Sequence, residues 1–196
     1  MSIKDKMNEL KKELLLEEAS KQFEETGYEH MKVADLAKTA QVSIGTIYAL
    51  FNSKEGLYLA YIEHQINNFY LELEDRALSK SSPKEKIHTF IELKFSYYNQ
   101  KRKAIEQSAT NNPLFFNTLV QEHSEAFQKI YNYLEKCFTK LNPKIDKDKA
   151  TRMAFAINGF SDGYISLWLE LNDNLMEKVD EVSDLFICMV EGCNEH

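Results

Sequence analysis

The chain has 196 residues and a formal net charge of -7; 43% of the residues are hydrophobic and 28% are charged, and only 6 are Gly and 3 are Pro. This length and composition suit one domain or two small ones around a buried core, which excludes a disordered chain, and the scarcity of turn residues favours an all-α fold over a sandwich or barrel. The negative charge speaks against a polybasic tail or a basic membrane-surface helix, so a binding site for nucleic acid has to be argued from local residues.

Hydrophobic periodicity and stop signals predict a row of helices. The first spans residues 5–26, with Leu10, Leu14, Ala19 and Phe23 facing inward, and ends at Gly27 in a left-handed cap. Short helices at 33–40 and 44–51 precede a long helix that starts at the N-cap Ser53, and Pro83 opens a helix to about residue 100. Further helices are expected at 114–140, 147–172 and 174–191. We therefore expect a three-helix head at 1–60 and a larger helical body at 61–196.

The spacing of apolar residues in the head is specific. Val33, Leu36 and Ala37 share one face of the first short helix, and Ile47 and Leu50 share the facing side of the second. Two helices joined by three or four residues cross steeply, which is the geometry of a helix-turn-helix motif. In such a motif the second helix enters the major groove of DNA, and its N-terminal residues meet base edges. Here these residues are Ser43, Ile44, Gly45 and Thr46.

A second signal is a combination of residues in the first third of the chain. It comprises Gly27-Tyr28, Val33-Ala34-Asp35-Leu36-Ala37, Val42-Ser43, Gly45-Thr46-Ile47-Tyr48, Phe51, Lys54-Glu55 and Leu57. Together these residues resemble the DNA-binding signature of TetR-family transcriptional regulators, over about residues 8–62. The resemblance implies a homodimeric repressor with a DNA-binding head and a ligand-sensing, dimerising body. On the motif positions and the neighbouring basic residues we expect contact with DNA from Lys32, Val33, Ser43, Ile44, Gly45, Thr46, Tyr48 and Lys54.

Two features of the head depart from the family pattern. Gln41 stands at the turn position that usually holds Gly, and a left-handed conformation there costs about 1 kcal/mol. Ala49 and Leu50 follow Tyr48 and donate no hydrogen bond to phosphate. Residues 1–62 contain 8 Lys and 10 Asp or Glu, a net of -2, so local lysines and helix N-termini would have to supply the affinity for DNA.

Aromatic residues are dense in the body and are expected first of all to fill its core. Aromatic cavities with a few polar groups are also typical of small-molecule sites. The polar candidates for an effector site are Tyr97, Tyr98, Asn111, Asn117, His123, Asn158, Asp162 and Tyr164. The effector is an unknown small molecule, and a body packed too tightly to hold one remains an alternative.

The last two helices carry a pattern suited to close packing. Ala156, Gly159, Gly163 and Ser166 form a stripe of small residues, and the last helix repeats apolar residues at spacings of four and three. The resemblance implies a four-helix dimer interface, for which we expect Gly159, Gly163, Trp168, Val182, Phe186 and Met189. Packing within one chain is the alternative.

Other classes of site have no support in the sequence. The three cysteines include no C-x-x-C pair, the histidines are scattered, and Glu85-x-x-His88 has no second copy, so we expect no disulfide framework, metal site or cofactor. Without a phosphate loop, G-x-S-x-G or HExxH motif, we expect no enzyme. No segment resembles a signal peptide or a membrane span, which favours a cytoplasmic protein. The rival hypothesis is a helical ligand-binding or scaffold protein that no longer reads DNA.

Overall fold

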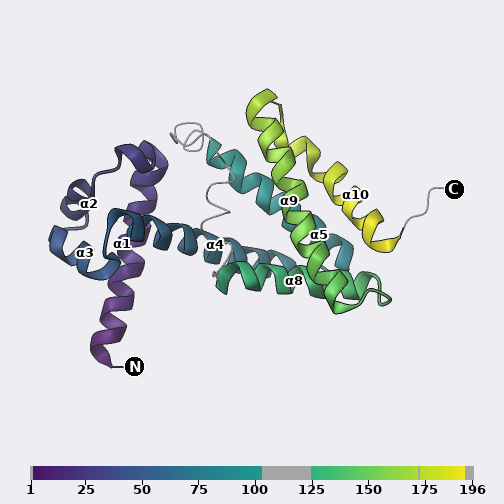
Figure 1. Ribbon diagram of the computed structural model, residues 1–196, viewed down its shortest axis with the longest axis horizontal. Coiled ribbons are helices and arrows are strands. Elements are labelled where there is room, and N and C mark those ends of the chain that lie inside the picture. The colour runs from purple at the N-terminus through teal and green to yellow at the C-terminus, as the bar shows by residue number, and fades with distance from the viewer. Residues whose placement is uncertain (1, 103–124, 172, 193–196) are drawn as a thin grey trace. The chain divides into compact units, whose positions relative to one another are not determined.

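The computed structural model describes residues 2–102, 125–171 and 173–192 (Figure 1). Within these ranges the chain forms helices and no strand, which confirms the all-α class. The helices are α1 (Ile3–His30), α2 (Val33–Thr39), α3 (Ile44–Phe51), α4 (Lys54–Leu78), α5 (Pro83–Gln100), α8 (Glu125–Leu141), α9 (Lys147–Leu171), the 3-10 helix η1 (Leu175–Lys178) and α10 (Val179–Glu191).

The described residues divide into two compact units. The head comprises residues 2–65, and the body comprises residues 66–102, 125–171 and 173–192. The boundary between the units falls inside α4, five residues after the predicted boundary at residue 60, so that α4 contributes to both units.

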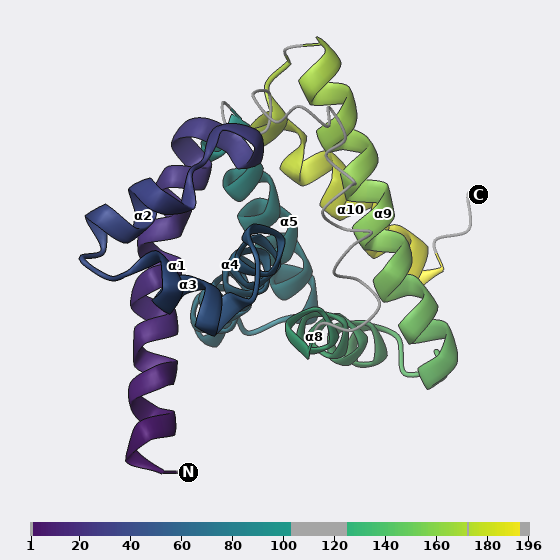
Figure 2. The ribbon, with the colours of Figure 1, turned by 60° about the vertical axis from the view of Figure 1, so that its left-hand side comes forward.

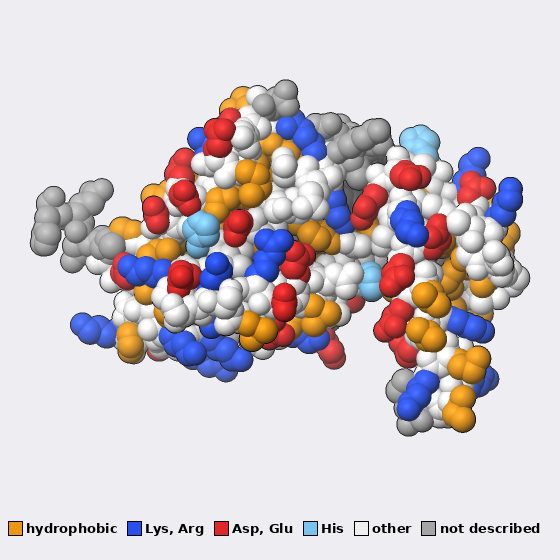
Figure 3. Space-filling view, turned by 180° about the vertical axis from the view of Figure 1, so that it is seen from behind, with side chains coloured by type: hydrophobic (Ala, Val, Ile, Leu, Met, Phe, Trp, Pro, Cys, Tyr) orange, Lys and Arg blue, Asp and Glu red, His pale blue; other side chains and the backbone are white. Residues whose placement is uncertain are grey.

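The core of the head lies under the second half of α1. Leu15, Leu16, Ala19 and Phe23 of α1 pack there with buried residues of α2, α3 and the start of α4. The expectation that Leu10 and Leu14 face inward was wrong: each is 56% exposed, and hydrophobic side chains stand at the surface near the N-terminal end of α1 in Figure 3. The helical spacing of apolar residues continues toward the N-terminus of α1, but its buried residues begin only at Leu15.

At the end of α1 the helix is interrupted at the predicted Gly27, and an unpredicted turn follows. Helical hydrogen bonding continues past Gly27 to His30, across a kink at Gly27 where φ is 73° and ψ is 170°. The Met31 N–H donates to the Gly27 carbonyl oxygen at 3.2 Å, which closes this last turn. Gly27, with its positive φ, therefore ends the first helical segment as predicted, and residues 28–30 add one further turn beyond the kink.

In the body, α5 is the central helix and packs against α8, α9, η1 and α10. Its start is the predicted one: Pro83 occupies the first turn, and Ser82 and Glu85 form a capping box. Most of the residues from Ile87 to Phe95 are buried, because neighbouring helices cover α5 on several sides. Helices α9 and α10 lie side by side (Figures 1 and 2). The ring centroids of Phe160 in α9 and Phe186 in α10 are 6.0 Å apart.

The C-terminal part of the body corrects one further expectation. The predicted helix 174–191 is a 3-10 turn at Leu175–Lys178 followed by α10, since the Asn174 side chain accepts a hydrogen bond from the Met176 N–H and caps the short turn separately. Of the predicted helix 114–140, residues 114–124 lie outside the described ranges, and α8 covers the rest.

Candidate functional site

Helices α2 and α3 form the helix-turn-helix motif expected from the spacing. Four residues, 40–43, join them, and Leu36, Ala37 and Ile47 meet in the core of the head. Gln41 has a φ of 54°, as predicted for the turn position that usually holds Gly. The Val42 N–H donates to the Ala37 carbonyl oxygen at 3.0 Å, which closes the turn and holds the start of α3 in place.

The N-terminal turn of α3 presents its side chains to solvent. Ser43 caps the helix: its Oγ accepts the Thr46 N–H at 3.0 Å and lies 2.8 Å from Thr46 Oγ1. Ile44 and Tyr48 are 43% and 42% exposed. A Cβ built on Gly45 would meet only Ser43 Oγ, at 3.7 Å, so the fold of the head does not require glycine at this position.

The predicted basic contacts have different environments. Lys32 is exposed at the N-cap of α2. Lys54 Nζ donates to the Glu29 carbonyl oxygen at 3.2 Å and lies 4.7 Å from the centroid of the Tyr28 ring, so it ties the start of α4 to the end of α1. Over the head, at the right of Figure 3, Lys and Arg are interspersed with Asp and Glu. The head thus offers separate lysines to a nucleic acid.

One predicted DNA contact requires correction. The Val33 side chain is 7% exposed and packs in the core of the head, because it lies on the same face of α2 as Leu36 and Ala37. Val33 therefore offers no side chain to a base or a phosphate.

Gly56 is a residue of the head that sequence reasoning missed. Its N–H donates to the capping Ser53 Oγ at 2.9 Å, as expected for a helix that starts after Ser53. A Cβ on Gly56 would lie 2.0 Å from the Phe51 carbonyl oxygen. Glycine therefore allows the end of α3 to approach the start of α4 closely. Nothing in the local sequence besides a Gly in the first turn of a helix signals this contact.

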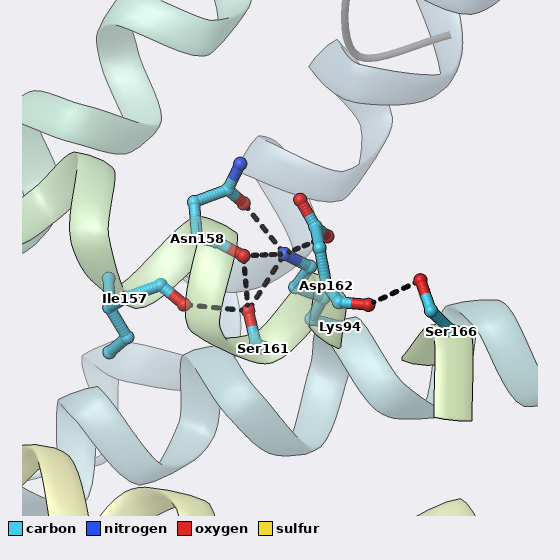
Figure 4. Close-up of polar contacts among 6 residues, drawn as sticks. All are labelled: Lys94, Ile157, Asn158, Ser161, Asp162 and Ser166. Atoms are coloured by element: carbon cyan, nitrogen blue, oxygen red, sulfur yellow. Dashed lines mark hydrogen bonds and ion pairs between the residues drawn. The ribbon is translucent and has the colours of Figure 1, made fainter. Parts of the chain in front are cut away.

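A buried polar cluster connects α5 with α9 in the body (Figure 4). Lys94 Nζ donates to Asn158 Oδ1 at 2.7 Å, to the Asn158 carbonyl oxygen at 3.1 Å and to Ser161 Oγ at 2.8 Å. It also forms an ion pair with Asp162 Oδ1 at 2.7 Å. The structure thus brings together the predicted Asn158 and Asp162, but around Lys94, which the prediction missed. The sequence feature that could have indicated Lys94 is a lysine placed among the apolar residues of 87–95.

Burial sets the electrostatics of this cluster. Desolvation lowers the pKa of Lys94, and the Asp162 carboxylate opposes that shift. Nearby, burial raises the pKa of Tyr131 to about 12, with the charge of Asp162 acting in the same direction. The Tyr131 hydroxyl is therefore protonated at neutral pH, and within the described part of the chain it has no hydrogen-bond partner.

Two of the other predicted effector residues have hydrogen bonds elsewhere in the body. The Tyr97 hydroxyl accepts a hydrogen bond from Lys101 Nζ at 3.1 Å, and Tyr98 is half-buried near the end of α5. The Tyr164 hydroxyl donates to Glu181 Oε1 of α10 at 2.7 Å. Asn111, Asn117 and His123 lie outside the described residues.

The residues expected at a dimer interface fall into two groups. Trp168, Val182 and Phe186 are at most 3% exposed and pack inside one protomer, so for them packing within one chain is correct. Gly159 and Gly163 are exposed on α9, and a Cβ on either would meet nothing within 4 Å. Met189 is 56% exposed. Helices α9 and α10 also carry exposed apolar residues that the prediction did not include: Phe155, Phe160, Leu167, Leu171 and Leu185.

Comparison with known proteins identifies the head. Residues 15–61 match the family model of bacterial regulatory proteins of the tetR family. The head therefore resembles the DNA-binding domain of TetR-family regulators. The matched residues include the whole helix-turn-helix motif, and with it the exposed N-terminal turn of α3.

Relatives of this chain include the fatty acid metabolism regulator protein of Bacillus subtilis. It is 30% identical over 82 residues, which span 42% of this chain and 42% of the relative. The structure resembles that of FadR from Bacillus subtilis in complex with stearoyl-CoA, with a TM-score of 0.66 and 22% identity, covering 88% of this chain and 96% of that chain. It also resembles FadR from Bacillus halodurans, with a TM-score of 0.67 and 20% identity, covering 90% and 94%. At these identities the likeness shows a shared fold.

None of the helices in the described ranges has both the length and the apolar character needed to cross a membrane. The same ranges hold no group of three or more His, Cys, Asp or Glu side chains placed to bind a metal ion.

Proposed function

We propose that the protein is a DNA-binding transcriptional regulator, a ligand-responsive homodimeric repressor of the TetR type that acts in the cytoplasm. The observation that carries this proposal is the N-terminal turn of α3. It is capped by Ser43, exposed at Ile44 and Tyr48, and held on a packed core that needs none of these side chains. A helix presented in this way fits the major groove, where N-terminal residues of a recognition helix meet base edges.

Gly45 adds a second argument for a DNA contact. Glycine inside a helix costs about 1 kcal/mol relative to alanine, and the head has room for a side chain here. The absence of a side chain therefore favours an external contact, such as the close approach of the helix backbone to DNA.

We propose that the body binds the effector and dimerises, and that α4 connects effector binding to the head. Because α4 belongs to both units, a shift of α4 on effector binding would change the separation of the two recognition helices in a dimer. Two heads must lie about one helical turn of DNA apart, so a small change in separation weakens operator binding. FadR of Bacillus subtilis was solved with stearoyl-CoA, which makes this acyl-CoA the first effector to test.

The test is binding of the full-length protein to the DNA upstream of its own gene, over a series of salt concentrations. We expect sequence-specific binding that weakens steeply as salt rises, because lysines displace counterions from phosphates. Tyr48→Phe should weaken binding about 3- to 10-fold through the loss of one hydroxyl contact. Gly45→Ala should weaken binding while the protein remains folded, as thermal unfolding would show.

The matched control for Tyr48→Phe is Tyr70→Phe in α4. Burial raises the pKa of Tyr70 to about 12, and its hydroxyl is hydrogen-bonded to Glu74 within the same helix, so the change should leave operator affinity unaltered. Absence of specific binding, both upstream of the gene and in a random-sequence DNA library, would overturn the proposal. It would favour instead a helical protein that binds ligands or partners without reading DNA. Operator affinity that does not change with stearoyl-CoA would exclude this effector.

A further inference from the structure

The recognition helix α3 carries an unusual set of side chains for a DNA reader. Its sequence from Ile44 to Phe51 is IGTIYALF, with no Arg, Lys, Asn, Gln, Asp or Glu. The contacts that distinguish guanine and adenine in the major groove are bidentate hydrogen bonds from Arg or Lys and from Asn or Gln, and Asp or Glu accept from cytosine. Helix α3 therefore forms none of these contacts.

The hydroxyl groups of the helix N-terminus are largely occupied by each other. Ser43 Oγ accepts the Thr46 N–H at 3.0 Å, and the Ser43 and Thr46 hydroxyls share one hydrogen bond at 2.8 Å. One hydroxyl hydrogen of this pair remains to donate to DNA, and Tyr48 adds a single hydroxyl on the same helix. Isolated hydroxyls contact either phosphates or several different bases, so they discriminate weakly among base pairs.

The exposed N-terminal turn of α3 is largely apolar. The Ile44 side chain is 43% exposed in the first turn, and Ala49 is exposed on the same helix. Ile47 and Phe51 are buried and hold the helix on the core of the head. Gly45, beside Ile44, has no side chain to keep the helix away from a groove. The exposed N-terminal turn is thus suited to apolar contact at short range.

Only one base presents an apolar group in the major groove, since thymine carries a C5-methyl group there. We propose that this protein recognises its operator through thymine methyl groups, with Ile44 as the residue that contacts them. The inference rests on the proposed function, in which α3 enters the major groove. Lys32, Lys38 and Gln41 lie outside α3, and in this arrangement they bind the phosphate backbone.

The experiment replaces each thymine of an operator half-site by uracil, symmetrically in both halves. Uracil keeps the base pairing and the O4 acceptor and removes only the methyl group. Burial of one methyl group corresponds to about fourfold in affinity, so a contacted pair of positions should lose on the order of tenfold. Replacement of the other thymines should leave the affinity unchanged. Binding of the full-length protein is measured at one fixed salt concentration.

Protein variants assign the contact to Ile44. In Ile44→Ala the penalty for uracil at the sensitive position should disappear, whereas Ile44→Val should keep most of it. Gln41→Ala is the control. Because it removes a phosphate contact, it should weaken binding to the thymine and uracil operators equally and keep the full difference in affinity between them. Because Ile44 is half exposed, thermal unfolding should show that these variants fold as the wild type does.

Two outcomes would overturn the inference, and they are distinguishable. If the uracil operators bind with the affinity of the thymine operator, while binding is still specific and salt-dependent, thymine reading is wrong and the proposed regulator stands. If the thymine operator itself is not bound specifically, the proposed function fails and this inference fails with it. A uracil penalty unchanged in Ile44→Ala would assign the contact to another residue and overturn the role of Ile44.

Discussion

Gly56 is the residue at which local propensity and tertiary packing make opposite predictions. Helix propensity alone predicts that Gly56→Ala stabilises the protein by about 1 kcal/mol. The structure predicts the reverse, because the new Cβ would lie 2.0 Å from the Phe51 carbonyl oxygen and force the backbone between α3 and α4 to move. We expect a loss of about 1 to 3 kcal/mol in the free energy of unfolding, measured by urea denaturation.

Gly45→Ala is the matched control for this prediction. It makes the same chemical change in the neighbouring helix, where the Cβ meets only Ser43 Oγ at 3.7 Å. We expect the stability of this variant to equal or exceed that of the wild type. Equal stability of the two alanine variants would show that α3 and α4 do not approach as closely as described.

Among the elements, α5 and α9 depend on each other through Lys94 and Asp162. The two side chains are 7% and 8% exposed, and the carboxylate lies 2.7 Å from the ammonium group. Lys94→Met leaves the Asp162 carboxylate buried without its counter-charge, so we expect a loss of about 3 to 5 kcal/mol in the free energy of unfolding. The double variant Lys94→Met/Asp162→Leu should recover much of this loss. A double-mutant cycle by urea denaturation measures the coupling.

Lys84→Met provides the comparison on the same helix. Lys84 also has an acidic partner, Glu191 at 2.6 Å, but its side chain is 51% exposed. Solvent screens this pair, so we expect a change within about 1 kcal/mol. If the losses in the free energy of unfolding of the two single variants, at Lys94 and at Asp162, added up to the loss of the double variant, the buried pair would not couple the two helices.

For the whole molecule, the exposed apolar residues of α9 and α10 predict self-association. Leu167 and Met189 are 51% and 56% exposed, and Gly159 and Gly163 leave room for a neighbouring backbone. We expect the wild type to sediment as a dimer. Leu167→Glu/Met189→Glu should raise its dissociation constant at least about 100-fold, because burial of each side chain contributes about 1.5 to 3 kcal/mol. Analytical ultracentrifugation over a range of concentrations measures this change.

Leu71→Glu tests whether any exposed leucine has this effect. Leu71 is 55% exposed on α4, outside the face formed by α9 and α10, so this variant should remain a dimer. Circular dichroism should show equal helix content in all variants. A wild type that stays monomeric at high concentration would contradict the proposed dimer.

The sequence by itself determined where most helices begin and end. The cap at Ser53, the start at Pro83 and the left-handed turn at Gln41 were all predicted, and the structure confirms them. These features depend on residues within about four positions of each other, which is the range of capping and of helical hydrogen bonds. The capped N-terminal turn of α3 belongs to the same class, because Ser43 and Thr46 lie within one helical turn of each other.

Only the tertiary structure decided which side of each helix is covered. Leu10 and Leu14 continue an apolar period and yet are exposed, whereas Trp168 and Phe186 are interior. Lys94 finds its partners in a helix more than 60 residues further along the chain. The physical reason is that periodicity defines a face of a helix, but what packs on that face, and how far along it, depends on contacts between residues distant in the sequence.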